Sequence, residues 1–143
     1  GLTDLATFLD ARGISTRYVG TDISSGVLRE ARRRHPERQV LEADVFTEPP
    51  FRDKTFDIIF CSGIFNLKLG NNRDFVFRNL PRLLPLSRRL IVANFLHIRA
   101  SRKYPHCYYY DPDELVNVLA DKVARLTIVD TYLQNDFSAV IYT

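Results

Sequence analysis

Apolar segments alternate with amphipathic ones along the chain, and this alternation constrains the fold more than any other feature. Helices are expected where apolar residues recur at helical spacing, and strands where short apolar runs end in polar or small residues. Strands that alternate with helices favour a mostly parallel sheet with helices on both faces, which is a three-layer α/β sandwich. The expected helices are residues 2–12, 25–35, 75–84 and 112–119, and the expected strands are 16–23, 39–45, 56–61, 89–95, 123–132 and 137–142.

Individual residues mark where several of these elements begin and end. Ser24 can cap the second helix, and Asp111 followed by Pro112 is a strong start for the last one. Gly13 is a stop for the first helix, and Pro81 predicts a break in the third.

The central and final strands carry two more specific expectations. The nearly continuous apolar run 56–61 predicts a strand buried on both faces. Segments 123–132 and 137–142 flank a polar turn at 134–136, which predicts an antiparallel closing hairpin.

Composition places the chain among ordinary globular proteins. Its 143 residues, 45% hydrophobic and 26% charged, suit a single domain spanning 1–143. No apolar run approaches the ~20 residues that cross a bilayer, so no membrane partner is expected. Cys61 and Cys107 are expected to be free thiols in a reducing, cytoplasmic compartment, and no metal-ligand spacing occurs. The net charge of +3 permits nucleic acid as a partner but does not indicate it.

Two acids stand at the ends of successive expected strands. Ligands of parallel α/β sheets bind at the carboxyl ends of strands, where an acid can accept hydrogen bonds from ribose hydroxyls. Asp22 occupies such a position, and Asp44 could accept the amino group of an adenine held between Ile23 and Val45. The alternative is that Asp22 and Ser24 only cap the helix that follows.

The order of segments YVGTDIS, VLEADVF, FDIIFCSGIFN and LIVANF, followed by the closing hairpin, resembles class I S-adenosylmethionine-dependent methyltransferases. This resemblance covers essentially the whole chain and implies a Rossmann-like fold, S-adenosylmethionine as cofactor and S-adenosylhomocysteine as product. It implies that Asp22 holds the ribose and that Asp44 meets the adenine. The cofactor-binding residues that it implies are Gly1, Asp22, Ile23, Ser24, Asp44, Val45, Cys61, Ser62 and Gly63.

A narrower resemblance is to a small bacterial subgroup of these enzymes. Segments SGIFNLKLG, YYYDP and DFSAVIYT are similar to its SGxFN and YYxDP motifs and its closing strand. Asn94 and Phe95 match its fifth-strand pair only in part.

The resemblance is incomplete at the beginning of the chain. The family opens with a strand and a glycine-rich loop, D-x-G-x-G-x-G, whereas this chain begins within that loop. Gly1 aligns with one of the loop glycines, and Thr3 stands where a last glycine is common. With no opening strand and no Met, the chain is expected to be an N-terminally truncated domain with exposed strand edges.

No residue is an obvious general base, and the catalytic residues are left unassigned. Asn66 could orient a methyl acceptor or simply hydrogen-bond the loop backbone. His97 and His106 could accept a proton, although a histidine in a loop is more often just exposed. Cys61 is expected to be inert because strand burial suppresses thiol reactivity.

Aromatic side chains provide weak candidates for substrate binding. Phe65 could form a lid or belong to the core, and Asn66 lies beside it. Tyr108, Tyr109 and Tyr110 could form an aromatic wall, with at least one of them packing against the core.

Three functions are therefore compatible with the sequence. The first is methyl transfer from S-adenosylmethionine to a small-molecule acceptor that the sequence does not identify. The alternatives are an NAD-dependent oxidoreductase domain and a non-catalytic Rossmann-like binding module. The oligomeric state is not readable from the sequence.

Overall fold

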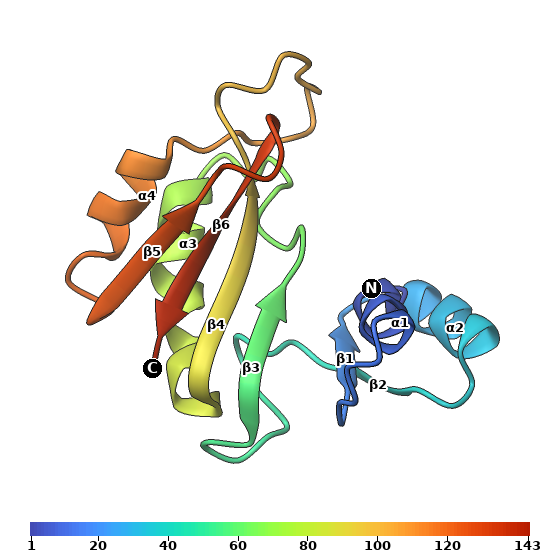
Figure 1. Cartoon of the computed structure of the whole chain (residues 1–143). Coiled ribbons are helices and arrows are strands. Elements are labelled where there is room, and N and C mark those ends of the chain that lie inside the picture. Colours follow the sequence, from blue (N-terminus) through green and yellow to red (C-terminus); the bar gives the residue numbers. More distant parts are fainter. The chain divides into compact units, whose positions relative to one another are not determined.

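The structure, a computed structural model, describes all 143 residues of the chain. It divides into two compact units, residues 1–50 and 51–143, and each is described here by itself (Figure 1). The single domain expected from the sequence stays a prediction.

The first unit contains a two-stranded parallel sheet with two helices. Strands β1 and β2 pair in parallel, with Val19 opposite Gln39 and Asp22 opposite Glu42. A small apolar core forms where Leu28 and Ala31 meet Val40. The elements are α1 (Asp4–Ala11), β1 (Val19–Asp22), α2 (Ser25–Arg34) and β2 (Gln39–Glu42).

The helix boundaries of this unit follow the expected local chemistry. Ser24 caps α2 by accepting a hydrogen bond from the backbone N–H of Val27 at 3.3 Å. Gly13 has a φ of +70° and donates its backbone N–H to the carbonyl of Asp10, which ends α1 in the left-handed conformation that glycine favours.

The second unit is a four-stranded mixed sheet with helices on one face. The strand order is β3-β4-β6-β5, and β6 runs antiparallel between β4 and β5. Helices α3 and α4 both lie behind the sheet in Figure 1. The elements are β3 (Phe56–Cys61), α3 (Asn72–Asn79), the 3-10 helix η1 (Leu80–Leu86), β4 (Ser87–Leu96), α4 (Pro112–Leu119), β5 (Arg125–Val129) and β6 (Asp136–Tyr142).

Several expectations for the second unit are confirmed. The closing strands pair antiparallel, and Pro81 coincides with the change from α3 to η1. Asp111 caps α4 by accepting a hydrogen bond from Asp113 N–H at 2.9 Å, with Pro112 at the first helical position.

The burial of β3 differs from the expectation. Instead of being covered on both faces, Ile58 is 56% exposed and Phe60 is 44% exposed. The reason is that Ile58 and Phe60 point to the same face of the sheet, where Phe60 lines an open hollow with Val92 and Val140, whereas α3 and α4 lie on the other face (Figure 1). The strands also form two sheets rather than one, and β1 and β3 each lie at an edge of their sheet.

Alternating side chains of β4 and β6 form the core of the second unit. Phe95 lies at its centre, with ring centroids 5.4 Å from both Phe65 and Phe137 and 4.9 Å from Tyr110. Three further side chains from the same faces, Ile91, Ala93 and Ile141, are fully buried. This aromatic cluster fixes the upper part of the sheet, where β3 and β4 end.

None of the helices has the length and apolarity needed to cross a membrane.

Candidate active site

The two acids singled out in the sequence lie at the carboxyl ends of neighbouring parallel strands. Asp22 ends β1 opposite Glu42, the last residue of β2, and Asp44 follows Glu42 by two positions. The backbone N–H of Ala43 donates to the carbonyl of Asp22 at 3.1 Å and continues the pairing beyond the strands. The first unit therefore brings both carboxylates to one edge of its sheet.

Asp22 is held by hydrogen bonds to both carboxylate oxygens. Oδ1 accepts from the backbone N–H of Ser24 at 2.9 Å, and Oδ2 accepts from the amino group of Gly1 at 2.5 Å. Partial burial raises the pKa of Asp22, but the amino group of Gly1 and the N–H groups of Ser24 and Ile23 outweigh it, so the pKa lies below its usual value. The carboxylate is ionised at neutral pH, as acceptance of hydrogen bonds from hydroxyl groups requires.

Asp44 has the same local geometry as Asp22. Its Oδ1 accepts a hydrogen bond from the backbone N–H of Phe46 at 2.9 Å, two residues further along the chain. Val45 is half-buried beside it, whereas Ile23 next to Asp22 is 75% exposed. An apolar side chain this exposed beside a charged strand end is suited to contact with a flat apolar ring.

Thr3 adopts a backbone conformation that suits glycine. It precedes α1 with a φ of 68°, in the left-handed region, where a β-branched residue is strained. Its side chain is only 3% exposed, and its Oγ1 has no hydrogen-bond partner. This geometry fits the glycine that the family resemblance places at this position.

At the end of β3 the side chains separate into buried and exposed ones. Cys61 is 2% exposed, and burial raises the pKa of its thiol to about 12, which is the environment expected for an unreactive cysteine. Since this side chain lies in the core, it is not available to a ligand. Ser62 and Gly63 are exposed, and Gly63 has a φ of +72° that turns the chain away from the strand.

The loop after β3 pairs with the loop after β4. The side-chain oxygen of Asn66 accepts a hydrogen bond from the backbone N–H of Leu96 at 3.1 Å. The backbone carbonyl of Asn66 accepts one from the backbone N–H of Tyr108 at 2.9 Å. An isolated bridge joins Leu67 to Cys107. The Asn66 side chain thus bonds the backbone at the end of β4, and its role toward an acceptor stays a prediction.

Asn72 anchors the same loop, and the sequence analysis missed it. It is 2% exposed; its Oδ1 accepts from Leu69 N–H at 2.8 Å, and its Nδ2 donates to the carbonyl of Leu67 at 2.6 Å. The one signal in the sequence is an asparagine pair at the start of an expected helix, which reads as a cap and not as a buried anchor.

The three tyrosines divide between the core and the surface. Tyr110 is buried, donates its hydroxyl to the Phe65 carbonyl at 2.8 Å, and has its pKa raised to about 12 by burial. This confirms that at least one of them packs against the core. Tyr108 and Tyr109 are half-buried. Phe65 itself is fully buried and belongs to the core rather than to a lid.

The two histidines have different environments. His106 is exposed, as expected for a loop residue. His97 is only 6% exposed, so the expectation of an exposed side chain is wrong for it. Its ring lies 5.3 Å from that of Phe137, and its Nδ1 accepts from Arg99 N–H at 3.2 Å. Burial and the charge of Arg99 lower the pKa of His97, so it is neutral at pH 7.

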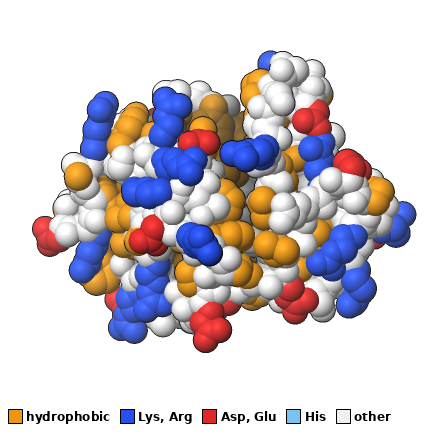
Figure 2. Space-filling view, turned by 90° about the horizontal axis from the view of Figure 1, so that it is seen from below, with side chains coloured by type: hydrophobic (Ala, Val, Ile, Leu, Met, Phe, Trp, Pro, Cys, Tyr) orange, Lys and Arg blue, Asp and Glu red, His pale blue; other side chains and the backbone are white.

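The open face of the four-stranded sheet carries a shallow hollow of about 480 Å³. Its floor is apolar, and a hydrogen-bonded group of Asn94, Tyr132 and Ser138 lies at one side, with distances of 3.1 and 2.9 Å. No group of three or more His, Cys, Asp or Glu side chains in the structure could hold a metal ion. In Figure 2, Lys and Arg side chains are spread among apolar and neutral ones on the face in view.

Comparisons with known proteins identify the family of the chain. A chain with acids at the ends of adjacent parallel strands has the architecture of nucleoside-binding α/β enzymes. Residues 2–91 match the family described as "Methyltransferase domain", and the chain belongs to this family. It is 28% identical over 148 residues to "Putative methyltransferase Rv1506c" of Mycobacterium tuberculosis, covering 99% of this chain and 87% of that protein.

Solved structures show the same fold. A SAM-dependent methyltransferase from Archaeoglobus fulgidus has a TM-score of 0.73 at 12% identity, with 100% of this chain and 82% of that chain covered. The PH0226 protein from Pyrococcus horikoshii OT3 has a TM-score of 0.69 at 17% identity, with coverages of 99% and 77%. Magnesium protoporphyrin IX methyltransferase from Synechocystis PCC 6803, solved with bound SAM, has a TM-score of 0.60 at 16% identity, with coverages of 98% and 77%. The fold is therefore that of the Rossmann-like SAM-dependent methyltransferases.

Proposed function

We propose that the chain transfers a methyl group from S-adenosylmethionine to a small-molecule acceptor, releasing S-adenosylhomocysteine. Membership of the methyltransferase family favours this function over the oxidoreductase and the non-catalytic module left open by the sequence. The free thiols of Cys61 and Cys107 suit a cytoplasmic setting.

The observation that carries the proposal is the pair of acids at one edge of the first sheet. Asp22 would accept the ribose hydroxyls, for which its ionised state is suited. Asp44, two residues beyond the end of β2, would accept the adenine amino group. The exposed Ile23 and the half-buried Val45 would contact the two faces of the ring. The two hydrogen-bond acceptors therefore fit an adenosine, with Gly1 and Ser24 beside Asp22.

At the end of β3, Ser62 and Gly63 would meet the methionine part of the cofactor. Both are exposed, and the positive φ of Gly63 belongs to a turn that leaves its Cα face open, with nothing within 4 Å of an added Cβ. The backbone there can approach a ligand closely. The Cys61 side chain is buried and takes no part in this contact.

The reaction places modest chemical demands on the chain. The sulfonium of S-adenosylmethionine supplies an already activated methyl group, so the contribution of the protein is to position the acceptor in line with it. Asn66 is a positioning residue in this scheme, because it ties the loop after β3 to the end of β4. Buried His97 is unsuited to taking a proton from an acceptor, whereas His106 is exposed in the loop after β4.

Calorimetric titration of S-adenosylhomocysteine tests this proposal. We expect binding to the chain, weakened about tenfold to a hundredfold by Asp22→Asn, which removes the negative charge and replaces one acceptor oxygen by an NH2 group. The loss corresponds to about 1.5–3 kcal/mol, the range for one hydrogen bond to a charged group. Asp44→Asn should weaken binding about tenfold, because one charged hydrogen bond is lost.

Asp121→Asn is the matched control, because it removes the same charge from an exposed residue in the other unit. It should leave the affinity unchanged within twofold. Equal effects of Asp22→Asn and Asp121→Asn, or no binding to the folded wild-type chain, would contradict the proposal. Tighter binding of NADH than of S-adenosylhomocysteine would favour the oxidoreductase alternative.

A further inference from the structure

The loop formed by residues 97–110 carries a concentration of positive charge that methyl transfer itself does not require. Neither this segment nor its partner, residues 62–73, contains a single Asp or Glu. Two of their arginines pair with acids outside the two segments: Arg73 with Glu114 at 2.9 Å, and Arg99 with Asp130 at 3.2 Å. Lys68, Arg102 and Lys103 form no ion pair.

Backbone pairing joins the two loops that carry these cations. Lys68 donates its backbone N–H to the carbonyl of His106 at 2.9 Å, next to the bridge between Leu67 and Cys107. The ring of His106 lies 5.8 Å from that of Tyr104. The backbone of Lys68 therefore pairs with the same loop segment, three residues after Lys103.

Tyrosine rings position the two cations of the turn. The guanidinium of Arg102 lies 5.0 Å from the centroid of Tyr104, and the ammonium of Lys103 lies 5.6 Å from that of Tyr109. The two rings are themselves connected, because the Tyr109 hydroxyl accepts the backbone N–H of Tyr104 at 2.8 Å. These contacts restrict long side chains that would otherwise lose more conformational entropy on binding an anion.

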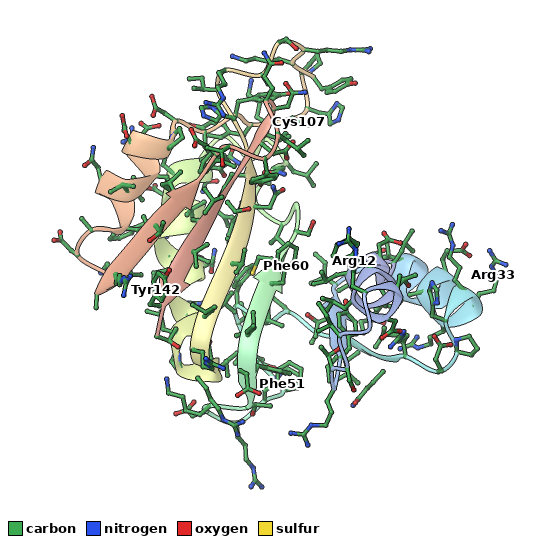
Figure 3. The ribbon with its side chains drawn as sticks, in the orientation of Figure 1. Arg12, Arg33, Phe51, Phe60, Cys107 and Tyr142 are labelled. Atoms are coloured by element: carbon green, nitrogen blue, oxygen red, sulfur yellow. The ribbon has the colours of Figure 1, made fainter.

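This loop lies at the same end of the sheet as Ser62 and Gly63, which the proposed function assigns to the methionine part of the cofactor. The loop lies beyond the carboxyl ends of β3 and β4 in Figure 1, and the labelled Cys107 marks it in Figure 3. Ser62 and Gly63 lie at the same end of the sheet, directly after β3.

We propose that the loop with Lys68, Arg102 and Lys103 binds a phosphate group of the methyl acceptor. This inference rests on the proposed methyl transfer, since it assigns the substrate class of the same site. A phosphate monoester carries close to two negative charges at neutral pH and offers three acceptor oxygens, which three cations without carboxylate partners can neutralise. A carboxylate, with one charge, would leave most of this cationic surface uncompensated.

Pyrophosphate, a probe with no carbon framework, tests the phosphate site in the full chain. Nuclear magnetic resonance titration in low salt should shift amide signals of residues 66–69 and 101–109. The double variant Arg102→Ala/Lys103→Ala should bind about tenfold more weakly, the sum of two exposed charge contacts of modest size. The control Arg88→Ala/Arg89→Ala removes the same charge from β4, near its amino end, and should bind pyrophosphate as the wild type does.

The outcomes separate this inference from the proposed function. Unchanged pyrophosphate affinity in the Arg102→Ala/Lys103→Ala variant, or equal weakening in the control, overturns the phosphate site. Acetate that binds as tightly as pyrophosphate overturns the choice of phosphate. If a single-stranded decanucleotide binds over tenfold more tightly than pyrophosphate and shifts signals beyond the two loops, the proposed small phosphorylated acceptor is overturned in favour of nucleic acid. S-adenosylhomocysteine titrated into the same variants reports on the cofactor site alone, and it should bind all of them equally.

Discussion

Replacement of Asn72 by alanine tests whether one buried amide holds the loop that follows β3. The side chain makes two short hydrogen bonds, from Leu69 N–H at 2.8 Å and to the Leu67 carbonyl at 2.6 Å. Alanine removes both and leaves two backbone groups without their partners. Because Asn72 is 2% exposed, it also leaves a small cavity.

The expected loss of stability follows from these contacts. Each backbone group deprived of its partner costs about 1–3 kcal/mol when buried, and Leu67 and Leu69 are exposed residues, so the lower end applies. The two groups then contribute about 2 kcal/mol, and the lost packing adds about 1 kcal/mol. We expect the free energy of unfolding to fall by about 3 kcal/mol.

Urea denaturation followed by circular dichroism measures this change, and the neighbouring asparagine provides the control. Asn71 is exposed and makes no side-chain capping bond at the start of α3, so Asn71→Ala should change the free energy of unfolding by less than about 0.5 kcal/mol. A loss below about 1 kcal/mol for Asn72→Ala, or equal losses for both variants, would refute the reasoning.

Two further predictions concern strained and titrating residues. Thr3→Gly should raise the free energy of unfolding by about 1 kcal/mol. The substitution removes the strain of a left-handed threonine and a buried hydroxyl that has no hydrogen-bond partner. These gains outweigh the extra conformational entropy that glycine gives to the unfolded chain. Urea denaturation checks it, and Thr7→Gly, inside α1, should instead destabilise by about 1 kcal/mol. The lowered pKa of His97 means that the unfolded chain binds its proton at higher pH than the folded one, so stability should fall as pH drops through about 6.5. His97→Gln should flatten this dependence between pH 7.5 and 5.5, and an identical slope in both proteins would show that other groups cause it.

Elements with local signals could be predicted well from the sequence. The cap at Ser24, the stop at Gly13 and the start of α4 at Asp111 each depend on bonds within a few residues. The same holds for the placement of Asp22 and Asp44 at strand ends, since a strand and the turn after it are local features. These are the parts of the chain where propensity, capping and turn chemistry agree.

Features that depend on distant partners could not be predicted in this way. The apolar run of β3 suggested burial on both faces, yet its exposure is decided by the helices, which cover only one face of the sheet. His97 has the sequence context of a loop residue, but Phe137 from β6 packs against its ring and buries it. Asn72 resembles a helix cap, and only the fold shows that it bonds the preceding loop.

The same contrast between local and distant contacts distinguishes the proposed cofactor-binding residues from the loops proposed to bind the acceptor. The carboxylates of Asp22 and Asp44 each accept a hydrogen bond from an N–H group two residues away, which is a local contact of the turn after the strand. The acceptor side depends on bonds between residues 30 and 45 positions apart, from Asn66 to Leu96 and from Tyr110 to Phe65. A change of loop sequence there alters the position of several acceptor-facing residues at once, while the cofactor acids stay in place. An arrangement of this kind allows acceptor specificity to diverge between relatives that retain the same cofactor, because the two sites share no orienting hydrogen bond among these contacts.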